Sequence, residues 1–450
     1  MRSSRPILLA TSVLGILGAT PVLADEAVEG FSISGTMRLR YEAIGGQARA
    51  GFNATDDLLN ARTTVAARYH GGRLEAAVEI YDSRVWGERT GTPLSTSEVN
   101  AFEPVQAYLA GTFDNPVGHG SRLKLTAGRM MLNLGSRRLV AADDYRNTTS
   151  SYTGLRADLS TRQGWQATLI YTLPQTRLPD TFEDLRSAKV RLDRESFDLV
   201  LWGGQISKAR TLGSAMSEIT YFHLREKDAP GYPTRDRSLD TFGGRLFADA
   251  RTGKIDYEVE ALYQTGSVST STASTAVRQK VAASFVHAAL GYTWDTTWKP
   301  RLSIEYDRAS GDGKGAKYGR FDTLFGMRRA DLAPSGLYNA VGRTNLESVG
   351  VRLEATPDKR LDGFAAYRPL WLSSREDSFS TTGVRDPLGQ SGRFAGHQME
   401  ARLRYWLAPK RLMVELDGLL LAKGRFLQDA PNATEGRWTR YGSFNLTARF

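Results

Sequence analysis

The chain has 450 residues, with 59 Lys and Arg against 49 Asp and Glu, and a formal net charge of +10. It contains no cysteine, which excludes disulfide frameworks and thiolate metal centres. The histidines are far apart in the sequence and show no spacing typical of metal ligands, so we expect neither a metal nor another cofactor. They are His70, His119, His223, His287 and His397.

Residues 1–24 have the features of a secretory signal peptide. Arg2 and Arg5 form a basic region, residues 7–19 are a short uncharged apolar run, and small residues precede a cleavage point after Ala24. We therefore expect the mature chain, residues 25–450, to leave the cytoplasm. An exported basic protein is expected to meet anionic carbohydrate or lipopolysaccharide rather than nucleic acid.

The rest of the chain alternates apolar and polar residues in segments of strand length. Between residues 33 and 42, for example, Met37 and Leu39 alternate with Arg38 and Arg40. We predict about 18 such strands and an all-β fold. The predicted strands are 33–42, 61–70, 74–81, 105–113, 123–131, 155–159, 165–173, 197–203, 219–225, 242–248, 255–263, 288–294, 302–306, 349–355, 364–367, 399–405, 412–418 and 441–450.

The connections between these strands are of two kinds, which predicts their orientation. Short turns are expected at 71–72, 252–253, 299–300, 356–359 and 407–410. Long loops are expected at 174–195, 266–279, 310–345, 373–393 and 423–440. Short periplasmic turns that alternate with long extracellular loops are typical of a membrane-spanning antiparallel β-barrel. No linker divides residues 25–450, so we expect one domain, and no blade-length repeat supports a propeller.

The final segment, 441–450, alternates strictly and ends the chain on Phe450. A terminal strand leaves an open edge unless it pairs with the first strand and closes the sheet. On these ten residues alone, an ordinary soluble edge strand remains open as an alternative. Closure predicts a bacterial outer-membrane barrel, because a terminal Phe on such a strand resembles the assembly signal that the barrel-assembly machinery recognises.

If the apolar side of each strand faces lipid, the opposite side faces a densely charged lumen. The arginines on that side are Arg38, Arg40, Arg62, Arg68, Arg129, Arg156, Arg245, Arg352, Arg402, Arg404 and Arg449. The acids are Glu42, Glu75, Glu79, Glu258, Glu260, Glu305, Asp307, Glu354, Glu400, Glu415 and Asp417. Buried charge must be paired or hydrated, so this pattern predicts a wet channel whose wall carries cross-strand ion pairs.

Two stretches resemble a known family. The first is Gly128-Arg129-Met130-Met131-Leu132-Asn133-Leu134-Gly135-Ser136-Arg137-Arg138-Leu139-Val140. The second runs from Tyr306-Asp307 through Ser310-Gly311-Asp312 to Arg320-Phe321-Asp322-Thr323-Leu324-Phe325-Gly326. Both are similar to motifs of the alginate export family of outer-membrane barrels, and residues 397–450 are similar too.

This resemblance implies a monomeric 18-stranded barrel with an electropositive, arginine-rich pore for a polyuronate. The matching charged positions are Arg129, Arg137, Arg138 and Asp307. Of the inward-facing arginines, we expect Arg38, Arg40, Arg129, Arg352, Arg402 and Arg404 to line the path, with Glu354 among the balancing acids. We also expect the 310–345 loop to fold into or over the mouth.

The sequence thus predicts a passive outer-membrane channel for an acidic saccharide or related anion. A general porin, or one for small organic anions, remains an alternative that the sequence does not separate from it. An outer-membrane enzyme is the third possibility, for which His223 and His287 are the candidates by default, since neither lies in a catalytic motif.

Overall fold

The computed structural model describes residues 29–143, 145–327 and 331–450. The predicted signal peptide, residues 1–24, lies outside the described residues. Within these residues the chain forms 18 strands in one antiparallel sheet and two short helices, α1 and α2. Neither helix is long and apolar enough to cross a membrane.

Each predicted strand has a counterpart, and most observed strands are longer than predicted. The first nine are β1 (Gly30–Gly45), β2 (Thr55–Gly71), β3 (Leu74–Trp86), β4 (Asn100–Asp114), β5 (Arg122–Met130), β6 (Tyr152–Ser160), β7 (Trp165–Pro174), β8 (Leu199–Leu212) and β9 (Ala215–Glu226). The others are β10 (Ser238–Ala248), β11 (Ile255–Ser269), β12 (Arg278–Thr293), β13 (Arg301–Ala309), β14 (Leu346–Ala355), β15 (Leu361–Trp371), β16 (Phe394–Ala408), β17 (Leu412–Lys423) and β18 (Trp438–Arg449). The helices are α1 (Phe182–Arg186) and α2 (Arg425–Asp429).

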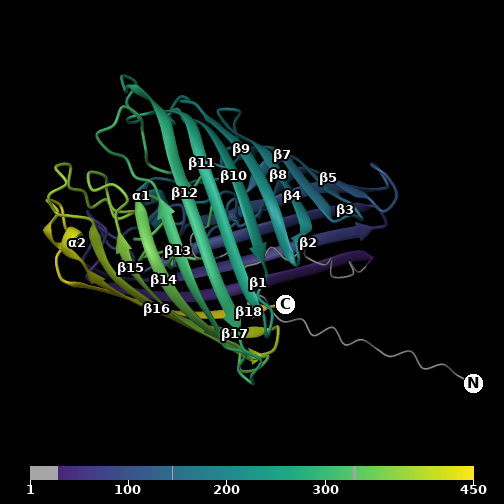
Figure 1. Ribbon diagram of the computed structural model, residues 1–450. Helices are drawn as coiled ribbons and strands as arrows, with labels where there is room; N and C mark the ends of the chain where they lie inside the picture. Colours follow the sequence, from purple (N-terminus) through teal and green to yellow (C-terminus); the bar gives the residue numbers. More distant parts are fainter. Residues whose placement is uncertain (1–28, 144, 328–330) are drawn as a thin grey trace, which may run out of the picture.

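The sheet closes because β1 pairs with both β2 and β18. Figure 1 shows the result as a tilted wall in which the yellow C-terminal strands lie beside the purple first strand. The register of β1 with β18 runs from Thr36↔Arg449 to Gly45↔Arg440. Phe450 continues the ladder, since its N–H donates to the Gly35 carbonyl at 3.1 Å and its carbonyl accepts from the Gly35 N–H at 2.9 Å. The wall therefore has no open edge along this seam, as the terminal strand predicted.

The two faces of the wall differ as the alternation predicts. On β1 the outward Met37 and Tyr41 are 47% and 48% exposed, whereas the intervening Arg38 and Arg40 are 6% and 2% exposed. Exposed tryptophans gather near both rims of the outer face. They are Trp165, Trp294 and Trp298 near one rim and Trp86, Trp202 and Trp438 near the other. Two aromatic girdles around an apolar band are the surface that a bilayer and its two interfaces require.

Connections at the two ends of the barrel differ in length. At the turn end, connections are short, as at 72–73, 213–214 and 409–411, whereas the loop end carries 131–151, 175–198, 310–345 and 372–393. The predicted long loop at 266–279 is wrong in its bounds. There β11 and β12 continue to the pair Ser269↔Arg278, which leaves only 270–277 as the connection. The residues that extend this pair are Ser267, Val268 and Ser269 opposite Lys280, Gln279 and Arg278, and they show no alternation of apolar and polar residues that would predict a strand.

The largest cluster of buried apolar side chains joins loops that fold inside the loop-end half of the barrel to the inner face of the surrounding strands. It includes Leu132 and Val140 of loop 131–151, Leu337 and Val341 of loop 310–345 and Phe379 of loop 372–393. The inward loops therefore share one apolar core with the inner face of the wall, for example with Phe222 and Leu262, and the wall separates this core from lipid.

We predict that the seam tolerates no side chain at position 35. A Cβ at Gly35 would lie 2.4 Å from the Phe450 ring and 2.5 Å from the Thr64 carbonyl oxygen, which is backbone and cannot move aside. Gly35→Ala should destabilise the barrel by about 1–3 kcal/mol, as overpacking does. The measurement is the thermal unfolding midpoint of the purified protein in detergent.

The matched control is Gly45→Ala on the same strand, because a Cβ there meets nothing within 4 Å. Equal midpoints for the two variants would contradict the close packing at the seam.

Candidate functional site

Two loops reach into the bore and pair with each other there. We call residues 131–151 and 310–345 the inner loop pair. The Ala141 N–H donates to the Phe325 carbonyl at 3.1 Å, and the Phe325 N–H donates to the Leu139 carbonyl at 2.9 Å. These bonds join the two stretches that carry the family resemblance. The 310–345 loop folds inward as expected, whereas the inward course of 131–151 was not predicted.

The loop 131–151 is fixed to the wall by arginines. Arg38 and Arg62 lie directly opposite each other on β1 and β2, which places like charges side by side. Both donate to the Arg146 carbonyl, at 2.7 and 3.1 Å, and Arg40 donates to the Tyr145 carbonyl at 2.7 Å. Arg40 also lies over the Tyr145 ring, 4.0 Å from its centroid. Backbone carbonyls of the loop therefore accept hydrogen bonds from these arginines and offset the repulsion between their positive charges.

The loop 310–345 is fixed to the same side through Glu42, which is 1% exposed. The Leu337 N–H donates to the Glu42 carboxylate at 3.2 Å, and the Gln47 amide donates to the Leu337 carbonyl at 3.0 Å. The adjacent Gly336 has φ +78°, and a Cβ there would lie 2.3 Å from the Glu42 carboxylate. A glycine is needed for this close approach.

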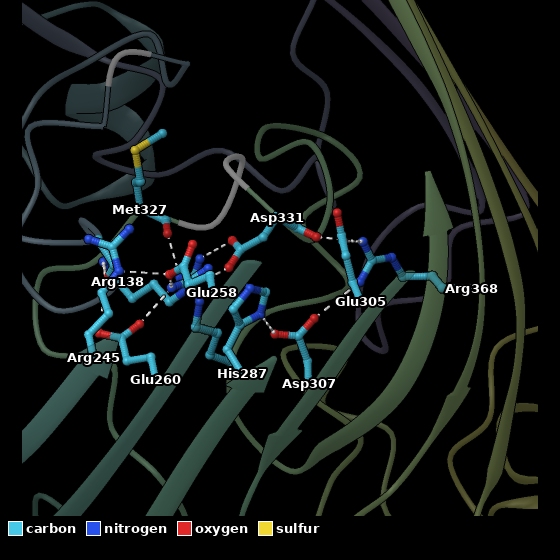
Figure 2. A network of polar contacts seen from close by, with 12 residues as sticks. Arg138, Arg245, Glu258, Glu260, His287, Glu305, Asp307, Met327, Asp331 and Arg368 are labelled. Atoms are coloured by element: carbon cyan, nitrogen blue, oxygen red, sulfur yellow. Dashed lines mark hydrogen bonds and ion pairs between the residues drawn. The ribbon is translucent and has the colours of Figure 1, made fainter. Parts of the chain in front are cut away.

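On the opposite wall, Asp331 is the centre of a network of ion pairs (Figure 2). It comes from loop 310–345, and its carboxylate accepts from Arg138 Nε at 2.7 Å and also binds Arg343. Arg138, from loop 131–151, binds Glu260 of β11 at 2.6 Å and pairs with Glu258. One carboxylate and one guanidinium thus tie both inner loops to each other and to β11.

The ionisation of Asp331 follows from these partners. Burial disfavours its charged form, but Arg343 and Arg138 outweigh burial and hold the pKa of the Asp331 carboxyl below its usual range. Burial likewise opposes the charge of Arg138, and Glu258 with Asp331 raises its pKa above the ordinary value. Both groups therefore remain charged at neutral pH, and the network is ionic.

A second part of this network surrounds His287 and Asp307. His287 Nδ1 is hydrogen-bonded to Asp307 at 2.8 Å, and Arg368 contacts Asp307 at 3.4 Å and Glu305 at 3.1 Å. Arg368 also donates to the Asp331 backbone carbonyl at 2.6 Å. Figure 2 shows these side chains in a row along the wall, which connects the predicted site residues Arg138 and Asp307.

His287, Asp307 and Asp331 lie within the reach of one metal ion, since their ligand atoms are all within 4.8 Å of one another. The donor set fits a cation poorly, however. The Asp331 and Asp307 carboxylates already accept from Arg138, Arg343 and Arg368, whose positive charges would repel a metal. Ion pairing is the better explanation of the cluster.

Four predicted site residues gather in the turn-end half of the bore. Arg352 and Arg402 both lie over the Phe364 ring, 3.7 and 4.9 Å from its centroid. Arg352 donates to Glu354 at 2.8 Å, and Arg404 donates to Asp362 at 2.8 Å. Phe364 is an inward apolar residue, which departs from the expected division between an apolar outer face and a polar inner one.

The other predicted site residues have separate surroundings. Arg129 is paired with Glu103 at 2.5 Å and also with Glu195, so its guanidinium is held between two carboxylates. Arg137 lies at a left-handed position of loop 131–151, φ 62°, where its carbonyl accepts from the Met327 N–H at 3.1 Å. The structure therefore places Arg129 away from the Asp331 network and uses the Arg137 backbone to join the inner loop pair.

Sequence reasoning missed three members of the Asp331 network. Asp331 and Arg343 lie in a loop without periodicity, so nothing in their spacing indicates which wall residues they meet. Arg368 follows the predicted strand 364–367 by one residue, and β15 in fact continues to Trp371. Continuing the alternation from the outward Tyr367 would have placed Arg368, the next residue, on the inner face.

Neither histidine proposed for an enzyme has catalytic surroundings. His223 is hydrogen-bonded to Asp240 at 2.8 Å and lies beside Trp202, whose exposed ring belongs to the outer aromatic girdle. His287 is buried in the ion-pair network. Among the hydrogen bonds of the described residues, no serine or threonine hydroxyl binds either imidazole. The barrel and these contacts point to a channel rather than to an enzyme.

Comparison with solved structures identifies the same architecture in outer-membrane porins. OccK2 (OpdF) of Pseudomonas aeruginosa, crystallised in complex with glucuronate, is 12% identical over 93% of this chain and 96% of its own, with a TM-score of 0.56. The outer-membrane protein OpdK of the same species is 11% identical over 93% and 99%, with a TM-score of 0.55. OccAB3 of Acinetobacter baumannii is 11% identical over 93% and 99%, with a TM-score of 0.58. At these identities the likeness concerns the fold.

A search of curated protein sequences finds no match to this chain. The model of one protein family, described as alginate export, matches residues 30–440, which is nearly the whole barrel. That match and the 18-stranded fold confirm the outer-membrane location. Barrels of this kind have short turns on the periplasmic side and long loops outside. The chain belongs to the alginate export family of outer-membrane β-barrels.

Proposed function

We propose that this outer-membrane channel carries acidic saccharides, of the uronate class, by diffusion along arginines of its bore. The observation that carries the proposal is that buried and half-buried arginines occur at successive depths. Arg343 lies at the inner loop pair, and Arg352, Arg402 and Arg404 lie towards the periplasm. An anion that leaves one guanidinium thus meets another further along the barrel.

Acids beside these arginines keep the attraction moderate. Glu354 binds both Arg352 and Arg301, at 2.8 Å each, and Asp362 lies between Arg402 and Arg404 at 3.9 and 2.8 Å. A passing carboxylate must compete with these acids for each guanidinium. Conduction requires such weak, repeated binding, because a site without competing acids would hold the anion too long.

The arginines over the Phe364 ring support a saccharide as the solute. Arg352 and Arg402 both lie over this inward ring, so two guanidinium groups are held at one place in the bore. A sugar offers hydroxyl groups that accept hydrogen bonds, and a uronate adds a carboxylate. Guanidinium groups donate to both kinds of acceptor.

The inner loop pair favours a second candidate, a channel for small organic anions. Leu337, Tyr338 and Val341 are fully buried inside the barrel, so the loops occupy much of the loop-end half of the bore. A single acidic unit needs less space than a polymer chain. Current block by glucuronate, by a uronate trisaccharide and by neutral glucose separates the candidates, since a polysaccharide channel should respond to the trisaccharide most strongly.

We predict that Arg402 and Arg404 set much of the anion preference. Replacing both with glutamine should lower the ratio of anion to cation permeability about threefold, because two positive charges leave the bore. The measurement is the reversal potential of single channels in a planar bilayer under a KCl gradient.

The matched control replaces Arg360 and Arg411 with glutamine, since both are exposed at periplasmic turns. A cation-selective wild type would contradict the proposed function. So would a ratio that falls equally in the two double variants.

We predict that Asp331 holds the inner loop pair in place. Asp331→Asn removes the charge that Arg138 and Arg343 share, so the loops should move more and the single-channel current should show additional, larger levels. Asp429→Asn, which removes an exposed carboxylate of α2, is the control. Identical current records for Asp331→Asn and wild type would show that the network does not restrain the loops.

The same network predicts a pH profile. Because the pKa of Asp331 is depressed, its contribution to loop stability is present above the ordinary Asp pKa of about 4 and is lost only as pH falls through the lower folded value. The difference in current levels between wild type and Asp331→Asn should therefore persist from neutral pH to about pH 4. Loss of that difference between pH 7 and pH 5 would contradict this assignment.

A further inference from the structure

A cavity of about 230 Å³ lies on the extracellular side of the Asp331 network. Its walls are the outer halves of β10, β11 and β12 together with loop 310–345. Leu239, Val268, Val281 and Phe321 give it an apolar side. A volume of this size suits one small ring or a short acid rather than several sugar units.

The polar lining of the cavity is predominantly basic. Arg235, Arg237, Arg320 and Arg343 contribute to it, against one acidic residue, Asp322. Three of these arginines have carboxylate partners. Arg237 binds Glu226 and Asp322, Arg320 binds Asp377, and Arg343 binds Asp331.

Arg235 differs from the other three. Its Nε donates to the Ser269 carbonyl at 2.9 Å and its Nη1 donates to the Tyr318 hydroxyl at 3.1 Å, while the guanidinium lies over the Tyr318 ring. Within the described residues no carboxylate pairs with it. Neutral acceptors orient this guanidinium without cancelling its charge, which leaves it suited to an anion.

Two buried polar atoms of the same lining have no protein partner in the described part of the chain. They are Nε of Arg343, a residue that is 1% exposed, and the hydroxyl oxygen of Thr344. Buried donors are almost always satisfied, so a pair of them at one cavity indicates a polar ligand or water there. The hydroxyl can donate and accept, whereas the guanidinium N–H only donates.

We propose that this cavity is an extracellular binding subsite for one carboxylate-bearing unit, a uronate or a small hydroxycarboxylate. Arg235 takes the carboxylate, Arg343 and Thr344 meet its other oxygens, and the apolar side lies against the carbon skeleton. The inference rests on the proposed function and adds a capture step before the Asp331 network. Arg343 belongs to both, so it joins the subsite to that network.

The test uses glucuronate added to the extracellular side of single channels, and the readout is the concentration that half-blocks the current. Arg235→Gln should raise that concentration about tenfold, because a charge-assisted contact is lost. Thr344→Val should raise it about threefold. Since the Thr344 hydroxyl has no protein partner in the described residues, this variant loses no bond of the fold and its unfolding midpoint should not fall.

The control is Arg385→Gln, which removes an exposed arginine of loop 372–393 that does not line the cavity. Equal effects of Arg235→Gln and Arg385→Gln, or no effect of Arg235→Gln and Thr344→Val, would overturn the subsite. The KCl reversal potential of the same channels tests the proposed function separately. If the wild type is anion-selective but both cavity variants have the wild-type half-blocking concentration, the proposed function is supported and only the subsite is excluded.

Discussion

The need to pair every backbone N–H and C=O group within the bilayer determines this structure, because lipid offers them no partner. An 18-stranded sheet meets that need only when closed, and here the closure depends on β1, β18 and the two bonds between Gly35 and Phe450. Once the wall is closed, each strand has one face in lipid and one in the bore. The polar half of the sequence is thereby forced inward, and the charge density of the bore follows from the closure.

Inward charge creates a second constraint, since like charges on neighbouring strands repel. Arg38 and Arg62 are opposite each other, and both use the Arg146 carbonyl of an inner loop as acceptor. On the other wall, Asp331 from one inner loop and Arg138 from the other complete ion pairs with β11. The inner loops and the charged wall thus stabilise each other. This dependence explains why a wide barrel contains a packed apolar core within its loop-end half.

The sequence predicts the parts of this structure that repeat and misses the parts that do not. Alternation places Met37 outward and Arg38 inward correctly, and the same rule accounts for the number of strands. It fails at the 266–279 hairpin, where the residues that extend the strand pair do not alternate, and at Phe364, which faces the bore. It gives no indication that Asp331, in a long loop, binds both Arg138 and Arg343. Such contacts depend on the course of long loops in three dimensions, which no local pattern encodes.

Partners, more than position on a strand, distinguish the arginines of the bore. Arg129 is inward as predicted, yet Glu103 and Glu195 enclose its guanidinium, so its charge stiffens the wall. Arg235 was not predicted at all, because it precedes its strand, and it is oriented by a carbonyl and a phenol. A guanidinium whose acceptors are neutral still attracts a passing carboxylate. The charge of a guanidinium between two carboxylates is already balanced, so it attracts a further anion only weakly. The arginines that matter for transport should therefore be those whose nearest acceptors carry no charge, or only one shared charge, as along the path from Arg235 to Arg404.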